Sequence, residues 1–185
     1  LAEGDIISID CGAIVDGWHG DSAVTVPVGE ITPEVERLIR ATEDAMWAGI
    51  AAIRADSFLR EVGASIEKRV EAAGDYGIVE EYGGHGIGTE MHQDPHVLNY
   101  ATRSKGPKLR TEVCLAIEPM LTLGSERTRL LGDGWTVTTV DGSCAAHAEH
   151  SVALTDEGPW VLTAHDGGAA RLGALGVPTP AATRV

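Results

Sequence analysis

The chain has 185 residues, 43% of them hydrophobic, which suits one well-buried domain and leaves little room for two. Its formal net charge of −14 argues against nucleic acid as a partner, because phosphate binding requires clustered lysine and arginine. No apolar run reaches the roughly 20 residues that cross a bilayer, and no secretory leader is recognisable. We therefore expect a cytoplasmic, monomeric protein without a membrane partner.

The first predicted element is a β-hairpin. Isoleucine- and valine-rich segments at 5–15 and 18–28 flank Asp16-Gly17, a pair typical of two-residue hairpin turns. The next elements are two helices. Thr32-Pro33 predicts a helix start, and apolar residues at helical spacing continue to Ile53.

A second amphipathic pattern runs from Leu59 to Val70 and ends before Gly74. Short strand-like pieces follow; they span 76–82, 113–117, 135–140 and 150–155. Helices followed by strands favour an α+β fold in which helices cover a largely antiparallel sheet. Residues 165–185 lack periodicity and are expected to form a disordered or loosely attached tail, outside a domain of residues 1–164.

Two aspartates share one face of the predicted hairpin. If Val15 pairs with Trp18, then Asp10 and Asp21 lie diagonally, at a backbone spacing of about 7–8 Å. The other residues of that face are small, whereas the opposite face is apolar and is expected to pack in the core. A cation would relieve the repulsion between the two carboxylates, although two solvated aspartates on an exposed face are an equal alternative.

His85 stands among four glycines between 83 and 88. A phosphate-binding loop does not fit, because no Lys-Ser/Thr pair follows the glycines, and His92 does not complete an HExxH motif. A structural role for either histidine stays open.

Two glutamates lie at the ends of apolar runs that are typical of buried strands. Glu118 follows residues 113–117, and Glu149 precedes residues 151–154. Carboxylates in such places are paired or ligate metals. A salt bridge is the alternative, but only 14 basic residues face 28 acidic ones. Oxygen ligands with one imidazole suit two divalent ions.

These motifs resemble those of the type I methionine aminopeptidase family. The similarity spans nearly all of residues 3–163 and comprises these segments: Ile9-Asp10, Asp16-Gly17-Trp18-His19-Gly20-Asp21, Gly84-His85-Gly86-Ile87-Gly88, His92-Gln93-Asp94-Pro95, Ile117-Glu118-Pro119-Met120 and Ala148-Glu149-His150. The family has the pita-bread fold, an antiparallel sheet wrapped by helices. The resemblance implies removal of the N-terminal methionine from nascent polypeptides and, from the family alone, association with the ribosome.

Carried over by position, the resemblance implies two divalent ions and leaves cobalt, manganese, iron and zinc as alternatives. Their ligands would be Asp10, Asp21, His85, Glu118 and Glu149, with Asp21 and Glu149 bridging. Glu118 would accept a proton from the attacking water. His92 would contact the substrate amide or the tetrahedral intermediate. Trp135 would contribute to the methionine pocket, and Met91 stands where an aromatic residue is frequent.

Family members also have an upstream segment with a further histidine and much of the methionine pocket. By position, that segment would lie before Leu1. We therefore expect the first part of the N-terminal half to be absent and the 185-residue chain to be weakly active or inactive. A proline-directed peptidase of the same fold is the nearest alternative. A binding protein or inert fragment is another, although it would be expected to lose ligands.

Overall fold

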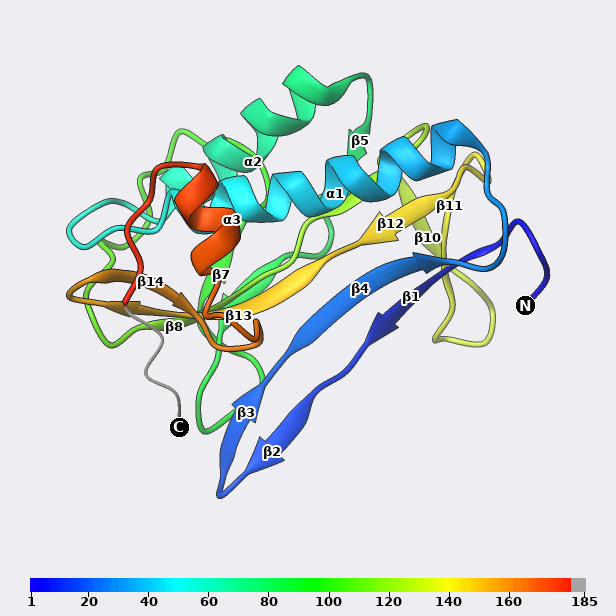
Figure 1. Cartoon of the computed structure of the whole chain (residues 1–185). Coiled ribbons are helices and arrows are strands. Elements are labelled where there is room, and N and C mark those ends of the chain that lie inside the picture. The colour runs from blue at the N-terminus through cyan, green and yellow to red at the C-terminus, as the bar shows by residue number, and fades with distance from the viewer. Residues whose placement is uncertain (181–185) are drawn as a thin grey trace.

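A curved antiparallel sheet forms the centre of the computed structural model, which describes residues 1–180. Six strands lie in the spatial order β1 (Ile6–Asp10), β4 (Ser22–Pro27), β13 (Glu149–Thr155), β8 (Cys114–Ile117), β6 (Gly84–Gly86) and β7 (Gln93–Val97), and β14 (Gly158–Val161) pairs with β13. Strands from the beginning and the end of the chain are therefore neighbours in the middle of this sheet (Figure 1).

Smaller sheets extend this centre. A three-stranded sheet contains β12 (Ala145–His147), β9 (Met120–Thr122) and β5 (Gly77–Ile78). Two hairpins are β2 (Ala13–Val15) with β3 (Trp18–Gly20), and β10 (Thr128–Leu130) with β11 (Val137–Thr139). The β2–β3 hairpin continues β1 and β4 away from the body of the molecule (Figure 1).

The hairpin turn has the predicted register. Val15 pairs with Trp18, and both turn residues have positive φ, 52° at Asp16 and 84° at Gly17. Asparagine, aspartate and glycine tolerate this conformation, which matches the twist of the two strands. The turn therefore fixes the pairing of Asp10 with Ala23 further along the ribbon.

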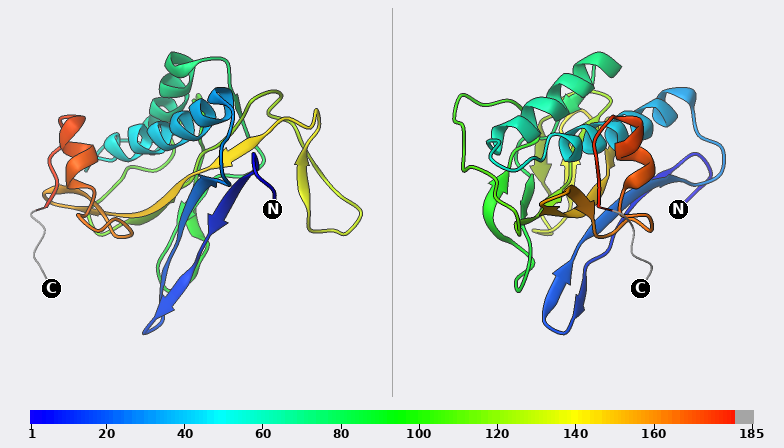
Figure 2. Two further views of the ribbon diagram at one scale, coloured as in Figure 1. Left: turned by 45° about the vertical axis from the view of Figure 1, so that its right-hand side comes forward. Right: turned by 60° about the vertical axis from the view of Figure 1, so that its left-hand side comes forward.

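Two helices, α1 (Pro33–Ala51) and α2 (Arg60–Ala73), cover one side of the sheets (Figures 1 and 2). Thr32 is the N-cap of α1, as predicted, and its hydroxyl accepts a hydrogen bond from the amide of Val35 at 3.4 Å. The core lies between helices and sheet and includes these fully buried side chains: Leu38, Ile50, Ile53, Val62, Ile66, Leu115, Ile117 and Leu121. None of the described helices is both long and apolar enough to cross a membrane.

The apolar face of the β1–β4 hairpin is not part of this core, contrary to our expectation. Ile9 is 49% exposed and Val24 is 51% exposed. Instead, the opposite face is buried along β4, at Ala23 and Thr25, because β12 packs there and the hydroxyl of Thr25 donates a hydrogen bond to the carbonyl oxygen of His147 at 2.7 Å. Strand alternation showed which residues share a face, but the curl of the sheet decides which face points inward.

The segment expected to be a disordered tail contains a short helix, α3 (Ala169–Ala174). Leu172 is buried against the core, and the Arg171 guanidinium lies 3.0 Å from a carboxylate oxygen of Asp44 and 3.2 Å from one of Glu43. The expectation was therefore wrong for this helix, which contacts the core through Leu172 and α1 through Arg171. Residues 181–185 of the same prediction lie outside the described residues.

Candidate metal centre

The register of the large sheet brings Asp10, Asp21 and Glu149 together. Asp10 on β1 and Glu149 on β13 both pair with Ala23, from opposite sides of β4. Asp21 directly precedes β4 on the same chain segment. The three carboxylates therefore come from three adjacent chain segments, on the face that the small residue Ala23 leaves open.

Ser151 fixes the backbone beside this cluster. Its hydroxyl accepts a hydrogen bond from the amide of Asp21 at 2.9 Å and donates one to the carbonyl oxygen of the same residue at 2.8 Å. The hydroxyl of Ser22 donates to the carbonyl oxygen of Glu149 at 3.1 Å. These cross-strand bonds hold the two carboxylate-bearing segments in a fixed relation.

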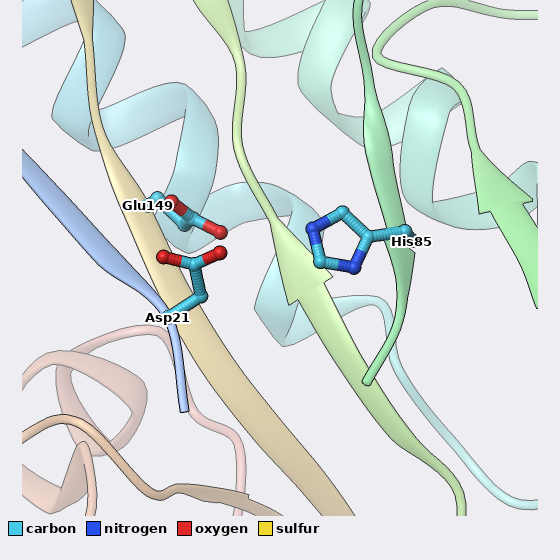
Figure 3. Close-up of side chains that lie close together, drawn as sticks. All are labelled: Asp21, His85 and Glu149. Carbon is cyan, nitrogen blue, oxygen red and sulfur yellow. The ribbon is translucent and has the colours of Figure 1, made fainter. Parts of the chain in front are cut away.

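The side chains of Asp21, His85 and Glu149 converge. Each offers one ligand atom within 4.8 Å of those of the other two. Figure 3 shows the two carboxylates side by side and the imidazole turned toward them across β8. This geometry can hold a cation. Its ligand atoms would come from three separate segments of the sheet.

The imidazole of His85 is oriented for this role. Its Nδ1 lies 2.9 Å from the carbonyl oxygen of Gly86, so Nδ1 has the proton and donates it, and Nε2 presents a lone pair. Nε2 lies 3.4 Å from Oε1 of Glu118. Two acceptor atoms that face each other at this distance require either a proton or a cation between them.

Burial and mutual repulsion raise the pKa values of the carboxylates. Burial first, then the charges of Asp21 and Asp10, raises the pKa of Glu118 to about 8. Burial, with Glu118, Asp21 and Asp10, raises the pKa of Glu149 to about 9. Burial and the charge of Asp10 also raise the pKa of Asp21, and the nearby His85 opposes this shift.

The donor set fits a divalent cation. Oε1 of Glu149 is buried and lacks a hydrogen-bond partner within the described residues. Buried polar atoms are normally paired, and buried like charges are costly without a counter-ion. A divalent ion would supply both the partner and the opposite charge.

The remaining predicted site residues differ in how closely they approach the cluster. His92 lies beside it, with its ring centroid 4.5 Å from that of His85 in an edge-to-face arrangement. Met91 packs over Gly12, because a Cβ atom at that glycine would lie 2.5 Å from the methyl group of Met91. Trp135 is not brought to the cluster: its side chain is 87% exposed, in the turn between β10 and β11.

Sequence reasoning missed His147. Its Nε2 lies 3.7 Å from Oε2 of Glu118 and is buried. Burial lowers the pKa of His147, and the charge of Asp10 partly opposes the shift. The alternation of His147 with Glu149 was a signal that both belong to the same face.

Comparison with known proteins identifies the family. Residues 1–156 match metallopeptidase family M24. The chain belongs to this family. It is 52% identical over 168 residues to methionine aminopeptidase 1 of Mycobacterium tuberculosis, a match that covers 88% of this chain and 63% of the relative. It is 46% identical over 163 residues to methionine aminopeptidase of Clostridium perfringens, covering 88% of this chain and 65% of the relative.

Solved structures confirm the predicted pita-bread fold. Methionine aminopeptidase of Thermotoga maritima superposes with a TM-score of 0.83 and 42% identity, over 87% of this chain and 64% of that one. Prolidase of Pyrococcus furiosus superposes with a TM-score of 0.67 and 20% identity, over 88% of this chain and 42% of that one, which shows the fold alone. The chain thus spans slightly under two thirds of the length of the methionine aminopeptidases named here.

Proposed function

We propose that this M24 chain contains the dinuclear metal centre of a methionine aminopeptidase. The proposed ligands are Asp10, Asp21, His85, Glu118 and Glu149, with Asp21 and Glu149 bridging. The observation that supports this most strongly is the convergence of buried carboxylates with raised pKa values on an imidazole whose Nε2 is free to ligate. Without a metal, Glu118 and Glu149 would hold protons at neutral pH, whereas bound cations would replace the protons and neutralise the ionised carboxylates.

The residues have distinct parts in peptide hydrolysis. Two divalent ions, when bound, would supply an activated water and polarise the scissile carbonyl. Glu118 would accept the proton of the attacking water, since its carboxylate lies beside the proposed ligand His85, with Oε1 at 3.4 Å from Nε2. His92 would donate a hydrogen bond to the oxygen that becomes negatively charged.

The proposed substrate is an N-terminal methionine on a nascent polypeptide. The relatives at 46% and 52% identity are methionine aminopeptidases, whereas the prolidase at 20% supports only the fold. Met91 beside Gly12 places one apolar wall next to the cluster. Nascent chains would make the cytoplasm, and by extension the ribosome, the place of action.

Metal binding and peptide cleavage test the proposal together. The chain, stripped with a chelator, is titrated calorimetrically with Co²⁺, Mn²⁺, Fe²⁺ and Zn²⁺ in turn, and we expect two ions per chain. Hydrolysis of Met-Ala-Ser and Ala-Pro-Ser peptides is then compared with the best metal. Faster cleavage of Met-Ala-Ser, at any absolute rate, supports the proposal, and Glu118→Gln should lower that rate at least about 100-fold.

The same experiments separate the alternatives. Preference for the Ala-Pro-Ser peptide would favour a proline-directed peptidase. Binding of two ions without cleavage of either peptide would favour an inert fragment or a non-catalytic binding protein of this fold. Absence of metal binding at neutral pH would refute the metal centre itself.

A further inference from the structure

The carboxylate of Glu118 lies between two imidazoles. His85 Nε2 lies 3.4 Å from Oε1, and His147 Nε2 lies 3.7 Å from Oε2. The first histidine belongs to the proposed ligand set, whereas the second does not. A carboxylate with a neighbour on each oxygen has its orientation defined on both sides.

The backbone of Glu118 is already fixed. The side-chain amide of Asn99 donates a hydrogen bond to the carbonyl oxygen of Glu118 at 3.3 Å, and Pro119 restricts the backbone of the preceding residue, Glu118, to extended conformations. Glu118 lies between β8 and β9, at the edge of the cluster. The freedom that remains is rotation of the side chain, and neighbours of the carboxylate must set it.

The backbone of His147 is fixed beside Glu118. Thr25 holds it on both sides of the peptide unit: the hydroxyl accepts from the amide of His147 at 2.8 Å and donates to its carbonyl oxygen at 2.7 Å. The ring also forms part of the wall of a cavity of about 350 Å³, together with Tyr82, Met120 and Val137. His147 therefore lies both at the wall of this cavity and beside Glu118.

The Nε2 atom of His147 lacks a hydrogen-bond partner among residues 1–180, although it is buried. In that part of the chain, Glu118 is the acidic residue within 4 Å of it. Buried polar atoms are nearly always paired, and hydrogen bonds to catalytic groups are often long before the site is loaded. A small rotation of the Glu118 carboxylate would bring Oε2 within hydrogen-bond distance.

We propose that His147 is a positioning residue that donates its Nε2–H to Oε2 of Glu118 and so directs Oε1 toward the metal centre. The inference rests on the proposed function, because it gives Glu118 a partner for its second oxygen. His147 is not itself a metal ligand in this arrangement. Among the described residues, the acidic side chain within 4 Å of its Nε2 is Glu118. The imidazole acts through Glu118 and does not contact the reacting atoms.

A double-mutant cycle on Co²⁺ affinity tests the proposal without relying on turnover. Replacement of partners of metal ligands typically costs 10- to 100-fold in metal affinity, so we expect His147→Ala to weaken the affected Co²⁺ site by about 10-fold. His147→Gln retains an N–H donor on the same strand and should stay within about threefold of the unchanged chain. In a Glu118→Ala background, His147→Ala should have no further effect. The visible absorption of bound Co²⁺ should shift in His147→Ala and return in His147→Gln.

The control is Val137→Ala, which enlarges the same cavity without contacting Glu118 and should leave Co²⁺ affinity and spectrum unchanged. Two results would overturn the inference: a loss in His147→Ala that persists in the Glu118→Ala background, or a His147→Gln variant as weak as His147→Ala. Equal affinity of His147→Ala and the unchanged chain would overturn it as well. A chain that binds no Co²⁺ at all would refute the proposed function, and this separate outcome would remove the basis for the inference.

Discussion

Replacement of Glu149 by glutamine should stabilise the metal-free chain at alkaline pH. Glu149 is 2% exposed, its Oε1 lacks a hydrogen-bond partner in the described chain, and its pKa is raised from 4.5 to about 9. In the unfolded chain the carboxyl ionises near its ordinary pKa, whereas the folded chain retains the proton. Stability from this group is therefore fully present below about pH 4.5 and is lost as the pH rises toward about 9.

The magnitude follows from the pH interval. At about pH 7.5 the carboxyl is ionised in the unfolded chain and protonated in the folded chain, and the pH lies about three units above the ordinary pKa. The free energy of unfolding is therefore lower by about 4 kcal/mol than at low pH, since one pH unit equals about 1.4 kcal/mol. An amide at this position is neutral but also lacks full hydrogen bonding, which offsets about 1 kcal/mol. We therefore expect Glu149→Gln to gain about 3 kcal/mol at pH 7.5 and to lose about 1 kcal/mol at pH 4.5, where the carboxyl costs almost nothing and only the amide offset remains.

Urea unfolding with a chelator present, followed by tryptophan fluorescence at both pH values, measures this difference. The control is Glu157→Gln, an exposed position in the turn between β13 and β14, which should change stability little at either pH. If Glu149→Gln is no more stable than the unchanged chain at pH 7.5, burial of this carboxylate is not the cost that the structure indicates. With saturating Mn²⁺ the order should reverse, because the unchanged chain alone retains the carboxylate that we propose as a metal ligand.

Further predictions concern metal, ligands and packing. A chelator should lower the thermal midpoint of the metal-loaded chain more at pH 8 than at pH 6, because deprotonated ligands bind metal better and the metal-free chain is weaker there; scanning fluorimetry measures this. Calorimetry should show that Asp10→Asn weakens at least one Mn²⁺ site about tenfold or more, and that Asp16→Asn in the hairpin turn does not. Gly84→Ala should cost about 1–3 kcal/mol in urea unfolding, because its Cβ would lie 2.2 Å from the carbonyl oxygen of Ala116, whereas Gly20→Ala meets no atom within 4 Å.

Local patterns predicted the elements better than their packing. The turn at Asp16-Gly17 determined the register of the hairpin, and with it the shared face of Asp10 and Asp21. The N-cap at Thr32 marked the start of α1 correctly. Both features depend on a few neighbouring residues, so sequence alone contains the necessary information.

Features that depend on distant contacts were missed. The exposure of Ile9 depends on how the whole sheet curls, and neither its hydrophobicity nor its alternation reports this. Ser151 looked like an ordinary strand residue, yet it binds Asp21 on both sides of its backbone. His147 and Asn99 support Glu118 from segments on either side of it in the sequence. Their roles become visible only when the strands are placed side by side.

The bond between Ser151 and Asp21 joins residues that are 130 positions apart. A ribosome must therefore synthesise almost the whole chain before the two halves of the cluster can meet, and closing so large a loop is slow. Until then the chain offers a cation an incomplete set of the proposed ligands, which lacks Glu149 and binds more weakly. Capture of metal should consequently be a late event that follows closure of the central sheet, so that a chain interrupted before β13 would leave the ribosome without ions.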